Sequence, residues 1–261
     1  MPALFFFITG CGIRSGHKPE NQAEPATISL ESEPETSGNS ASITEIQETE
    51  TETKAEGTPV SLTGNMQYEA NIFLSNFAEQ FIQQYDVKDH NVEFLINFAH
   101  TYAKINEAGA ISYGMYESIT LDYANSVLER FFGDSVTAGE LQSFPYPADS
   151  YESFYSGPYY SNGNLYWVPA GGGTTLEFVV VDSVLSFPDG HYEMTFIKYK
   201  LSDFSYESIG GLAVTEYYYS MTPDQAASAS DLNQIGTGSA SVYPKYYNGH
   251  DSYELIKYQE Y

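Results

Sequence analysis

The chain has 261 residues, a single cysteine and a formal net charge of −25, because 35 Asp and Glu residues stand against only ten Lys and Arg residues. One cysteine excludes an internal disulfide framework and any metal site built from several cysteines. The charge excludes nucleic acid as a partner, because binding to nucleic acid depends on Lys and Arg neutralising phosphates.

The N-terminus is predicted to hold a signal-peptide remnant, residues 1–10, followed by a lipid attachment site. The apolar run from Leu4 to Ile8 is too short to cross a bilayer but is typical of a secretory signal. It ends in the stretch ITGC, which closes with Cys11 and resembles the lipobox of bacterial lipoproteins of the Gram-positive type. That resemblance implies a diacylglyceryl group on the Cys11 sulfur, cleavage just before it, and anchoring on the outer face of the bacterial cytoplasmic membrane. Because only three residues precede Leu4 and none of them is basic, we expect the true start to lie upstream.

Residues 11–65 are predicted to form a disordered acidic tether. Glu, Ser, Thr and Pro dominate this segment, and it contains no aromatic residue. Such a composition cannot bury enough apolar surface to offset the entropy of ordering the chain. A flexible linker of this length spans on the order of 40 Å, so it would hold the predicted single domain, residues 66–261, away from the membrane.

Three helices are predicted at the start of the domain. Phe73, Phe77, Phe81 and Tyr85 recur every fourth residue, which predicts a first helix with one aromatic face. The spacing of Asn76 and Glu79 resembles a capping box and places the start of this helix near Ser75.

Two further helices follow, with a short strand over residues 110–120 between them. The second helix is capped by Asp89 and ends at Asn106, and its apolar residues share one face. The third helix starts near Thr120 and stops at Gly133.

The rest of the chain is typical of antiparallel strands. Hairpins are predicted at 175–201, turned at Pro188-Asp189-Gly190, and at 238–261, turned at Asn248-Gly249. Between them we expect a strand at 211–221 and a polar loop with a short helical turn near residue 223. Helices followed by antiparallel strands indicate an α+β fold, with N-terminal helices packed on a curved sheet. This order of elements resembles the nuclear-transport-factor-2-like or cystatin-like cone.

No pattern in the sequence points to a catalytic, cofactor or metal site. The histidines are scattered and form no pair at ligand spacing, and there is no nucleophile elbow. The glycine-rich stretch 170–175 lacks the lysine and the following helix of a phosphate loop, and residues 86–93 lack the spacing of a calcium loop, although weak surface calcium binding is left open. We therefore predict no catalytic residue, no cofactor and no metal.

Aromatic side chains are the remaining candidates for binding a ligand. They suit contacts with sugars or peptides as well as half-buried sheet surfaces. If the cone-like fold forms a pocket, one face of these residues is expected to line it. The candidate binding residues are Tyr159, Tyr160, Tyr166, Trp167, Tyr217 and Tyr219.

Three functions fit these patterns. The first is a lipid-anchored surface protein, not an enzyme, whose domain binds a glycan, peptide or protein ligand. The second is a hydrolase acting on wall or glycan material, which would need a pair of carboxylates that the sequence does not reveal. The third is a structural interaction module in a membrane-associated complex, which would present a flat apolar patch.

Overall fold

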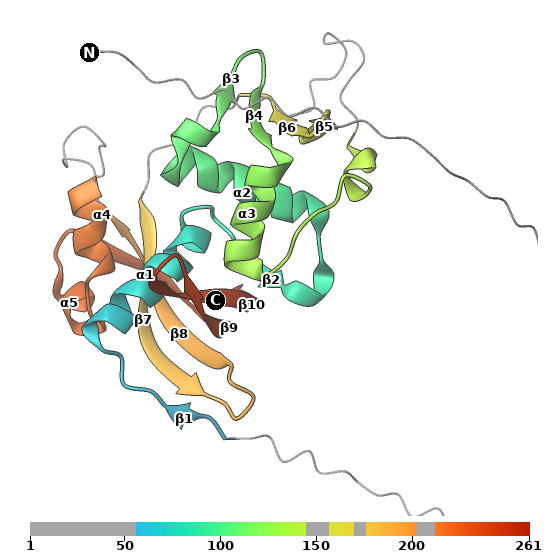
Figure 1. The fold of residues 1–261 in the computed structure, drawn as a ribbon. Helices are drawn as coiled ribbons and strands as arrows, with labels where there is room; N and C mark the ends of the chain where they lie inside the picture. The colour runs from blue at the N-terminus through green and yellow to red at the C-terminus, as the bar shows by residue number, and fades with distance from the viewer. Residues whose placement is uncertain (1–55, 145–156, 170–175, 202–211) are drawn as a thin grey trace, which may run out of the picture. The chain divides into compact units, whose positions relative to one another are not determined.

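The computed structural model describes residues 56–144, 157–169, 176–201 and 212–261, which all lie in one compact unit (Figure 1). The predicted signal-peptide remnant, Cys11 and most of the predicted tether lie outside the described residues.

Helices and antiparallel strands are both present, which confirms the α+β class. The helices are α1 (Gly64–Ala78), α2 (Val92–Asn106), α3 (Leu121–Phe132), α4 (Leu212–Tyr219) and α5 (Pro223–Ser228), with the short turns η1 (Val87–Asp89), η2 (Ala108–Ala110) and η3 (Glu140–Ser143). The strands are β1 (Thr58–Pro59), β2 (Gln84–Asp86), β3 (Ser112–Tyr113), β4 (Glu117–Thr120), β5 (Tyr159–Ser161), β6 (Asn164–Trp167), β7 (Glu177–Ser186), β8 (Tyr192–Leu201), β9 (Leu232–Tyr247) and β10 (His250–Glu260).

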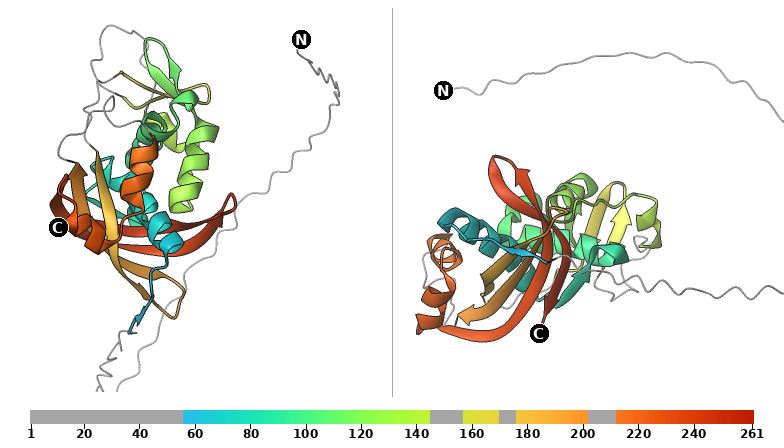
Figure 2. Two further views of the ribbon diagram at one scale, coloured as in Figure 1. Left: turned by 90° about the vertical axis from the view of Figure 1, so that its left-hand side faces the viewer. Right: turned by 90° about the horizontal axis from the view of Figure 1, so that it is seen from below.

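The strands form two antiparallel sheets. The larger has the order β1-β7-β8-β9-β10-β2, and the smaller has the order β3-β4-β6-β5. The two long hairpins, β7–β8 and β9–β10, turn where the sequence predicts. These long strands bend past α1, and each pairing contains a register shift that accommodates the bend (Figures 1 and 2).

The main core lies between α1, α2, α3 and one face of the larger sheet, called here the inner face. Phe77 is at its centre, and its ring contacts Phe98 of α2, Phe131 of α3 and Tyr258 of β10. A smaller core covers part of the outer face, where Phe178 of β7 and Tyr199 of β8 pack with Tyr218 of α4. Among the described residues, this smaller core does not extend to the middle of β9 or to β10. The outer face of the sheet there stays available for other contacts.

The third helix is the most accurately predicted element. It starts where Thr120 accepts a hydrogen bond from the Tyr123 N–H (3.1 Å), and it stops at Gly133, which has a left-handed φ of 60°. The second helix ends at Asn106 as predicted, but its N-cap is Asn91, which accepts from the Phe94 N–H (3.0 Å). Asp89 lies instead in η1, because the chain makes a separate short turn before the helix.

The predicted start of the first helix is wrong. The helix begins at Gly64, with Thr63 as its N-cap, and Glu79 lies at its C-terminal end rather than in a capping box. It stops before Phe81, which adopts a φ of 58° and is 58% exposed. Tyr85 pairs with Tyr258 as part of β2. Pairing with the edge of β10 therefore outweighs the aromatic spacing that favours a longer helix.

Secondary structure in the described residues also begins before the predicted boundary at residue 66. Thr58 and Pro59 pair with the end of β7, and the Val60 N–H donates to the carbonyl of Val184 (2.9 Å). The last residues of the predicted tether are thus part of the sheet and of α1.

The segment predicted as a strand at 211–221 contains helix α4. Its β-branched and tyrosine-rich composition favours a strand, but tertiary contacts decide its conformation. The carbonyls of Tyr219 and Met221, at and after the end of α4, both accept hydrogen bonds from the Asn71 side chain (2.9 and 3.0 Å). The short helix predicted near residue 223 is confirmed as α5, with a capping box between Thr222 and Gln225.

A row of polar side chains on α1 makes hydrogen bonds with the backbone of β7, as a neighbouring strand would. Gln67, Asn71 and Ser75 follow one another at intervals of four residues, so they lie on one helix face. Ser75 accepts from the N–H of Val179 (3.1 Å), and Asn71 accepts from the N–H of Val181 (2.8 Å). Gln67 donates to the Val181 carbonyl (2.8 Å) and to the Asn71 Oδ1 (3.0 Å). The row therefore satisfies backbone groups of β7 beyond the reach of β1.

Glu79 continues this row and makes stability depend on pH. Burial raises the pKa of its carboxyl to about 7, although a hydrogen bond from the Tyr219 hydroxyl acts in the opposite direction. A carboxyl whose pKa is raised in the fold stabilises the fold below its ordinary pKa and loses that contribution as pH rises through the folded value. A shift of this size corresponds to about 3 kcal/mol.

We expect Glu79→Gln to unfold at the same urea concentration as the wild type at pH 4.5. At pH 8 the variant should be more stable by about 1–3 kcal/mol, because it removes a buried charge and still accepts the tyrosine hydrogen bond. Urea unfolding at the two pH values measures this difference. A difference that is the same at both pH values would show that the fold does not raise the pKa of Glu79.

Candidate functional site

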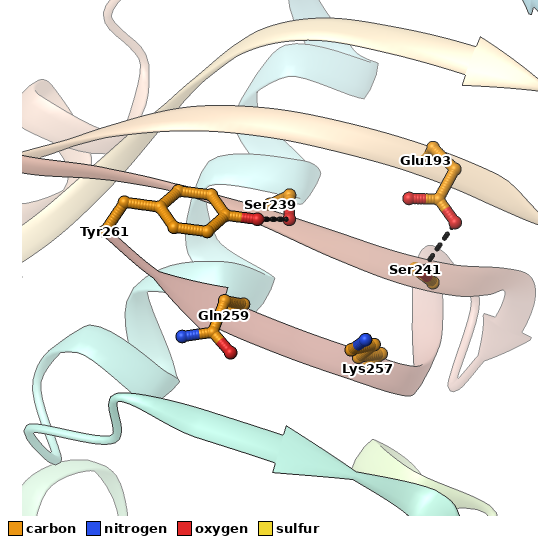
Figure 3. Close-up of a pocket in the computed structure, with 6 residues that line it drawn as sticks. All are labelled: Glu193, Ser239, Ser241, Lys257, Gln259 and Tyr261. Atoms are coloured by element: carbon orange, nitrogen blue, oxygen red, sulfur yellow. Dashed lines mark hydrogen bonds between the residues drawn. The ribbon is translucent and has the colours of Figure 1, made fainter.

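A polar groove runs along β9 on the outer face of the larger sheet. Ala240 and Val242 are buried in the main core, so their neighbours Ser239 and Ser241 point outward. Because these two side chains are short, they form a floor between the longer side chains of β8 and β10. The groove encloses about 370 Å³, and its lining is Glu193, Ser239, Ser241, Lys257, Gln259 and Tyr261 (Figure 3).

The strand register places the lining residues in two rows across the sheet. Ser241 lies directly opposite Glu193 of β8 and opposite Lys257 of β10. In the next row, Ser239 lies opposite Gln259. The register of β10 shifts between Leu255 and Lys257, and this bulge turns Lys257 and Gln259 to the outer face.

Hydrogen bonds hold two sides of the groove. Ser241 Oγ donates to Glu193 Oε1 (2.6 Å), and Ser239 Oγ lies 3.1 Å from the Tyr261 hydroxyl, as Figure 3 shows. Gln259 Nε2 donates to the carbonyl of Glu260 (2.9 Å). Within the parts of the chain that the structure describes, the Lys257 ammonium makes no ion pair or hydrogen bond.

A second cavity of about 400 Å³ adjoins the groove around β2. Lys257 and Gln259 line both cavities, so the two meet at these residues. The other lining residues are Gln84, Tyr85, Asp86, Asp89, Asn91, Phe94 and Tyr258.

The aromatic residues predicted to bind a ligand fall into two separate groups. Tyr159 and Tyr160 are on β5, and Tyr166 and Trp167 are on β6, so these four lie together in the smaller sheet. Tyr159 is buried, and Tyr160 and Tyr166 are half-buried. Trp167 is only 6% exposed and belongs to the main core.

Trp167 is covered by residues of α2. Its ring stacks on that of His100 at 4.1 Å between centroids, and its indole N–H donates to Asn97 Oδ1 (2.8 Å). One face of the indole is therefore already occupied. The sequence analysis predicted a ligand contact for Trp167, and the structure places this residue in a packed aromatic cluster.

Tyr217 and Tyr219 lie on α4, where they point in different directions. Residues two apart on a helix do not face the same side. Tyr217 is 61% exposed, whereas the Tyr219 hydroxyl donates to Glu79 and its ring contacts Phe178 of β7. The structure does not bring these two tyrosines together with the four of the smaller sheet.

A cluster of titratable residues around His100 lies away from the groove. His100 is buried with its Nε2 3.1 Å from Glu117 Oε2, and Lys104 lies 2.9 Å from the same oxygen. Burial lowers the pKa of His100 to about 4 despite the nearby carboxylate, so the ring is neutral at pH 7 and stacks on Trp167 as an uncharged plane. This cluster joins α2 to the smaller sheet.

His90 joins η1 to the segment after α3. Its Nδ1 lies 2.7 Å from Asp134 Oδ2, and its Nε2 lies 2.8 Å from Glu140 Oε1. Hydrogen bonds from Thr137 are the main cause that lowers the pKa of Glu140 to about 2. Among the described residues, no group of three or more His, Cys, Asp and Glu side chains is arranged to hold a metal ion.

Sequence reasoning missed the residues of the groove. The signal that was present is the run of small residues GTGSAS at 236–241, inside a strand that ends at a predicted hairpin turn. A trench of small residues between two strands with long polar side chains forms a groove wherever that face is left uncovered.

Comparison with known proteins adds no template for this site. No protein-family model matches the chain, and neither a curated protein nor a solved structure is significantly similar to it. The resemblance to the nuclear-transport-factor-2-like and cystatin-like folds therefore stays a prediction. No helix in the described ranges is long and apolar enough to span a membrane.

Proposed function

We propose that this chain is a non-catalytic binding protein, held at the bacterial surface by a lipid on Cys11, and that the groove over β9 binds a saccharide. The observation that carries the binding proposal is the groove itself, an uncovered polar trench of about 370 Å³. A volume of this order suits a small ligand or a segment of a longer one.

The chemistry of the lining favours a saccharide. Hydroxyl groups of Ser239 and Ser241 and the amide of Gln259 both donate and accept hydrogen bonds, as sugar hydroxyls do. The Tyr261 ring lies at one end of the groove, where it offers an apolar surface beside a polar hydroxyl (Figure 3).

The position of the groove favours a saccharide over a peptide. Peptides that join a sheet do so at an exposed edge, through backbone hydrogen bonds. Here the floor is a central strand, and β9 is paired with β8 on one side and β10 on the other. A ligand in the groove therefore meets side chains only.

The positions of the carboxyl groups favour a binding function over a hydrolase function. Glycoside hydrolysis needs two carboxyl groups facing one bond, one of which has a raised pKa. Among the described residues, Glu193 is the only acidic one that lines the groove, and Glu79, whose carboxyl has a pKa of about 7, lies at the end of α1.

The binding site is tested by filling the groove. We expect Ser241→Leu to weaken saccharide binding at least tenfold on a glycan array or by calorimetry, because the larger side chain occupies the floor and leaves Glu193 without its hydrogen bond. Ser112→Leu, an exposed position on β3, is the matched control and should bind as the wild type does. Equal binding by all three proteins would place the ligand elsewhere.

The lipid anchor is tested separately. When the protein is expressed from its own gene in a Gram-positive host fed a fatty-acid probe, the wild type should be labelled and Cys11→Ser should not. The variant should also be released from the membrane fraction. Labelling of both proteins to the same extent would contradict attachment at Cys11.

A further inference from the structure

We infer that the groove binds an acidic saccharide, whose carboxylate is held by Lys257 where the two cavities meet. This inference rests on the proposed function and specifies the ligand class. Lys257 lines both cavities, and in the rows of the sheet it lies between Ser241 of β9 and Asp86 of β2. Lys257 is therefore available to a ligand in either cavity.

The two acidic residues in the same row across the sheet, Glu193 and Asp86, already have hydrogen-bond partners. Glu193 accepts a hydrogen bond from Ser241 (2.6 Å) and lies 3.4 Å from the His191 Nε2. Asp86 caps η1, since its Oδ1 accepts from the N–H of Lys88 (3.0 Å). The lysine is the member of the row whose charge has no partner among the described residues.

Three other lysines of the domain form ion pairs with glutamates. Lys198 is buried between Glu177 and Glu260, at 3.1 and 2.9 Å. Lys104 lies on Glu117, and Lys245 lies on Glu254. With a net charge of −25, carboxylates are plentiful, so an unpaired lysine at the junction of two cavities is available for an anion carried by a ligand.

The neighbours of Lys257 supply the rest of a sugar site. Residues opposite one another in adjacent strands have Cβ atoms about 5 Å apart, so Ser241 and Lys257 are direct neighbours on the same face of the sheet. Gln259 is two residues along the same strand face. A carboxylate on Lys257 with ring hydroxyls on Ser241 and Gln259 matches a uronic acid residue.

The test uses an array of oligosaccharides of galacturonic, glucuronic and mannuronic acid, each printed beside its methyl ester. The ester removes the charge and leaves the sugar unchanged. We expect the wild-type protein to bind at least one acid about tenfold more tightly than its ester. Lys257→Met should reduce the acid to the affinity of the ester, whereas Lys257→Arg should keep the preference. Lys200→Met is the matched control and should behave as the wild type.

The outcomes separate the inference from the proposed function. Equal binding of acid and ester by the wild type, lost in Ser241→Leu, would overturn the role of Lys257 and leave saccharide binding in the groove intact. Binding of no saccharide would overturn both proposals. An acidic hexapeptide that binds more tightly than every saccharide and depends on Lys257 would overturn the saccharide as the ligand.

Discussion

Replacing Asn71 by Leu is expected to destabilise the protein by about 4 kcal/mol, more than any other single substitution in the polar row of α1. The Asn71 side chain is fully buried and uses all of its hydrogen-bonding capacity. Its Oδ1 accepts from the Val181 N–H and from Gln67, and its Nδ2 donates to the carbonyls of Tyr219 and Met221. Leucine has nearly the same size but leaves these groups buried and unpaired, and each such group costs about 1–3 kcal/mol.

Urea unfolding followed by circular dichroism measures this loss. The matched control is Asn65→Leu on the exposed side of the same helix, which should change the free energy of unfolding by less than about 0.5 kcal/mol. Because small domains are stable by only about 5–15 kcal/mol, Asn71→Leu itself can fail to fold.

Two milder variants keep the prediction measurable. Ser75→Ala removes the acceptor for the Val179 N–H, and Gln67→Met removes the donor to the Val181 carbonyl. Each should cost about 1–2 kcal/mol, less than Asn71→Leu, because each leaves fewer backbone groups unpaired. If all three variants were as stable as Asn65→Leu, the prediction would be wrong. Water would then have to supply the hydrogen bonds that the polar row makes with the backbone of β7.

The sequence predicts elements well where local chemistry determines them. Thr120 and Gly133 set the ends of α3, and Asn248-Gly249 sets the turn of the last hairpin, because caps and tight turns depend on residues close in the chain. Prediction fails where contacts between segments distant in the sequence determine the secondary structure. The end of α1 depends on the pairing of β2 with β10, and the helical state of α4 depends on contacts with β7 and Asn71.

The groove could not be predicted for a more specific reason. Counting outward from the Asn248-Gly249 turn pairs Leu255 with Val242, and without interruption it would pair Ser241 with Ile256. The bulge inserts one residue and pairs Ser241 with Lys257 instead. Since a shift of one residue moves every later side chain to the opposite face, the composition of the groove follows from a bulge that has no clear sequence signature.

A second large effect is expected for Gly238→Ala, which should destabilise the protein by about 3 kcal/mol, at the upper end for an overpacked core. Gly238 is on the inner face of β9, directly opposite Phe196. A methyl group there would contact the Phe196 ring and lie 2.5 Å from the carbonyl oxygen of Gln259. Phe196 stacks on Tyr258 at 5.2 Å between centroids, so the ring cannot move without disturbing the main core.

The matched control is Gly236→Ala, two residues earlier on the same strand. There the nearest atom to the new methyl group is the Tyr261 carbonyl oxygen at 3.5 Å, an ordinary contact, so the change should lie within about 0.5 kcal/mol of the wild type. Thermal and urea unfolding of both variants give the comparison.

A double substitution identifies the cause of the loss. If the ring is the obstacle, Phe196→Leu should cost less in the Gly238→Ala background than in the wild type, with a coupling of at least about 1 kcal/mol. Additive effects would instead assign the cost to the Gln259 carbonyl, whose residue also lines the groove, and Gly238→Ala should then weaken saccharide binding as well as stability. Equal stability of Gly238→Ala and Gly236→Ala would contradict the close contact between β9 and the Phe196 ring on which both explanations depend.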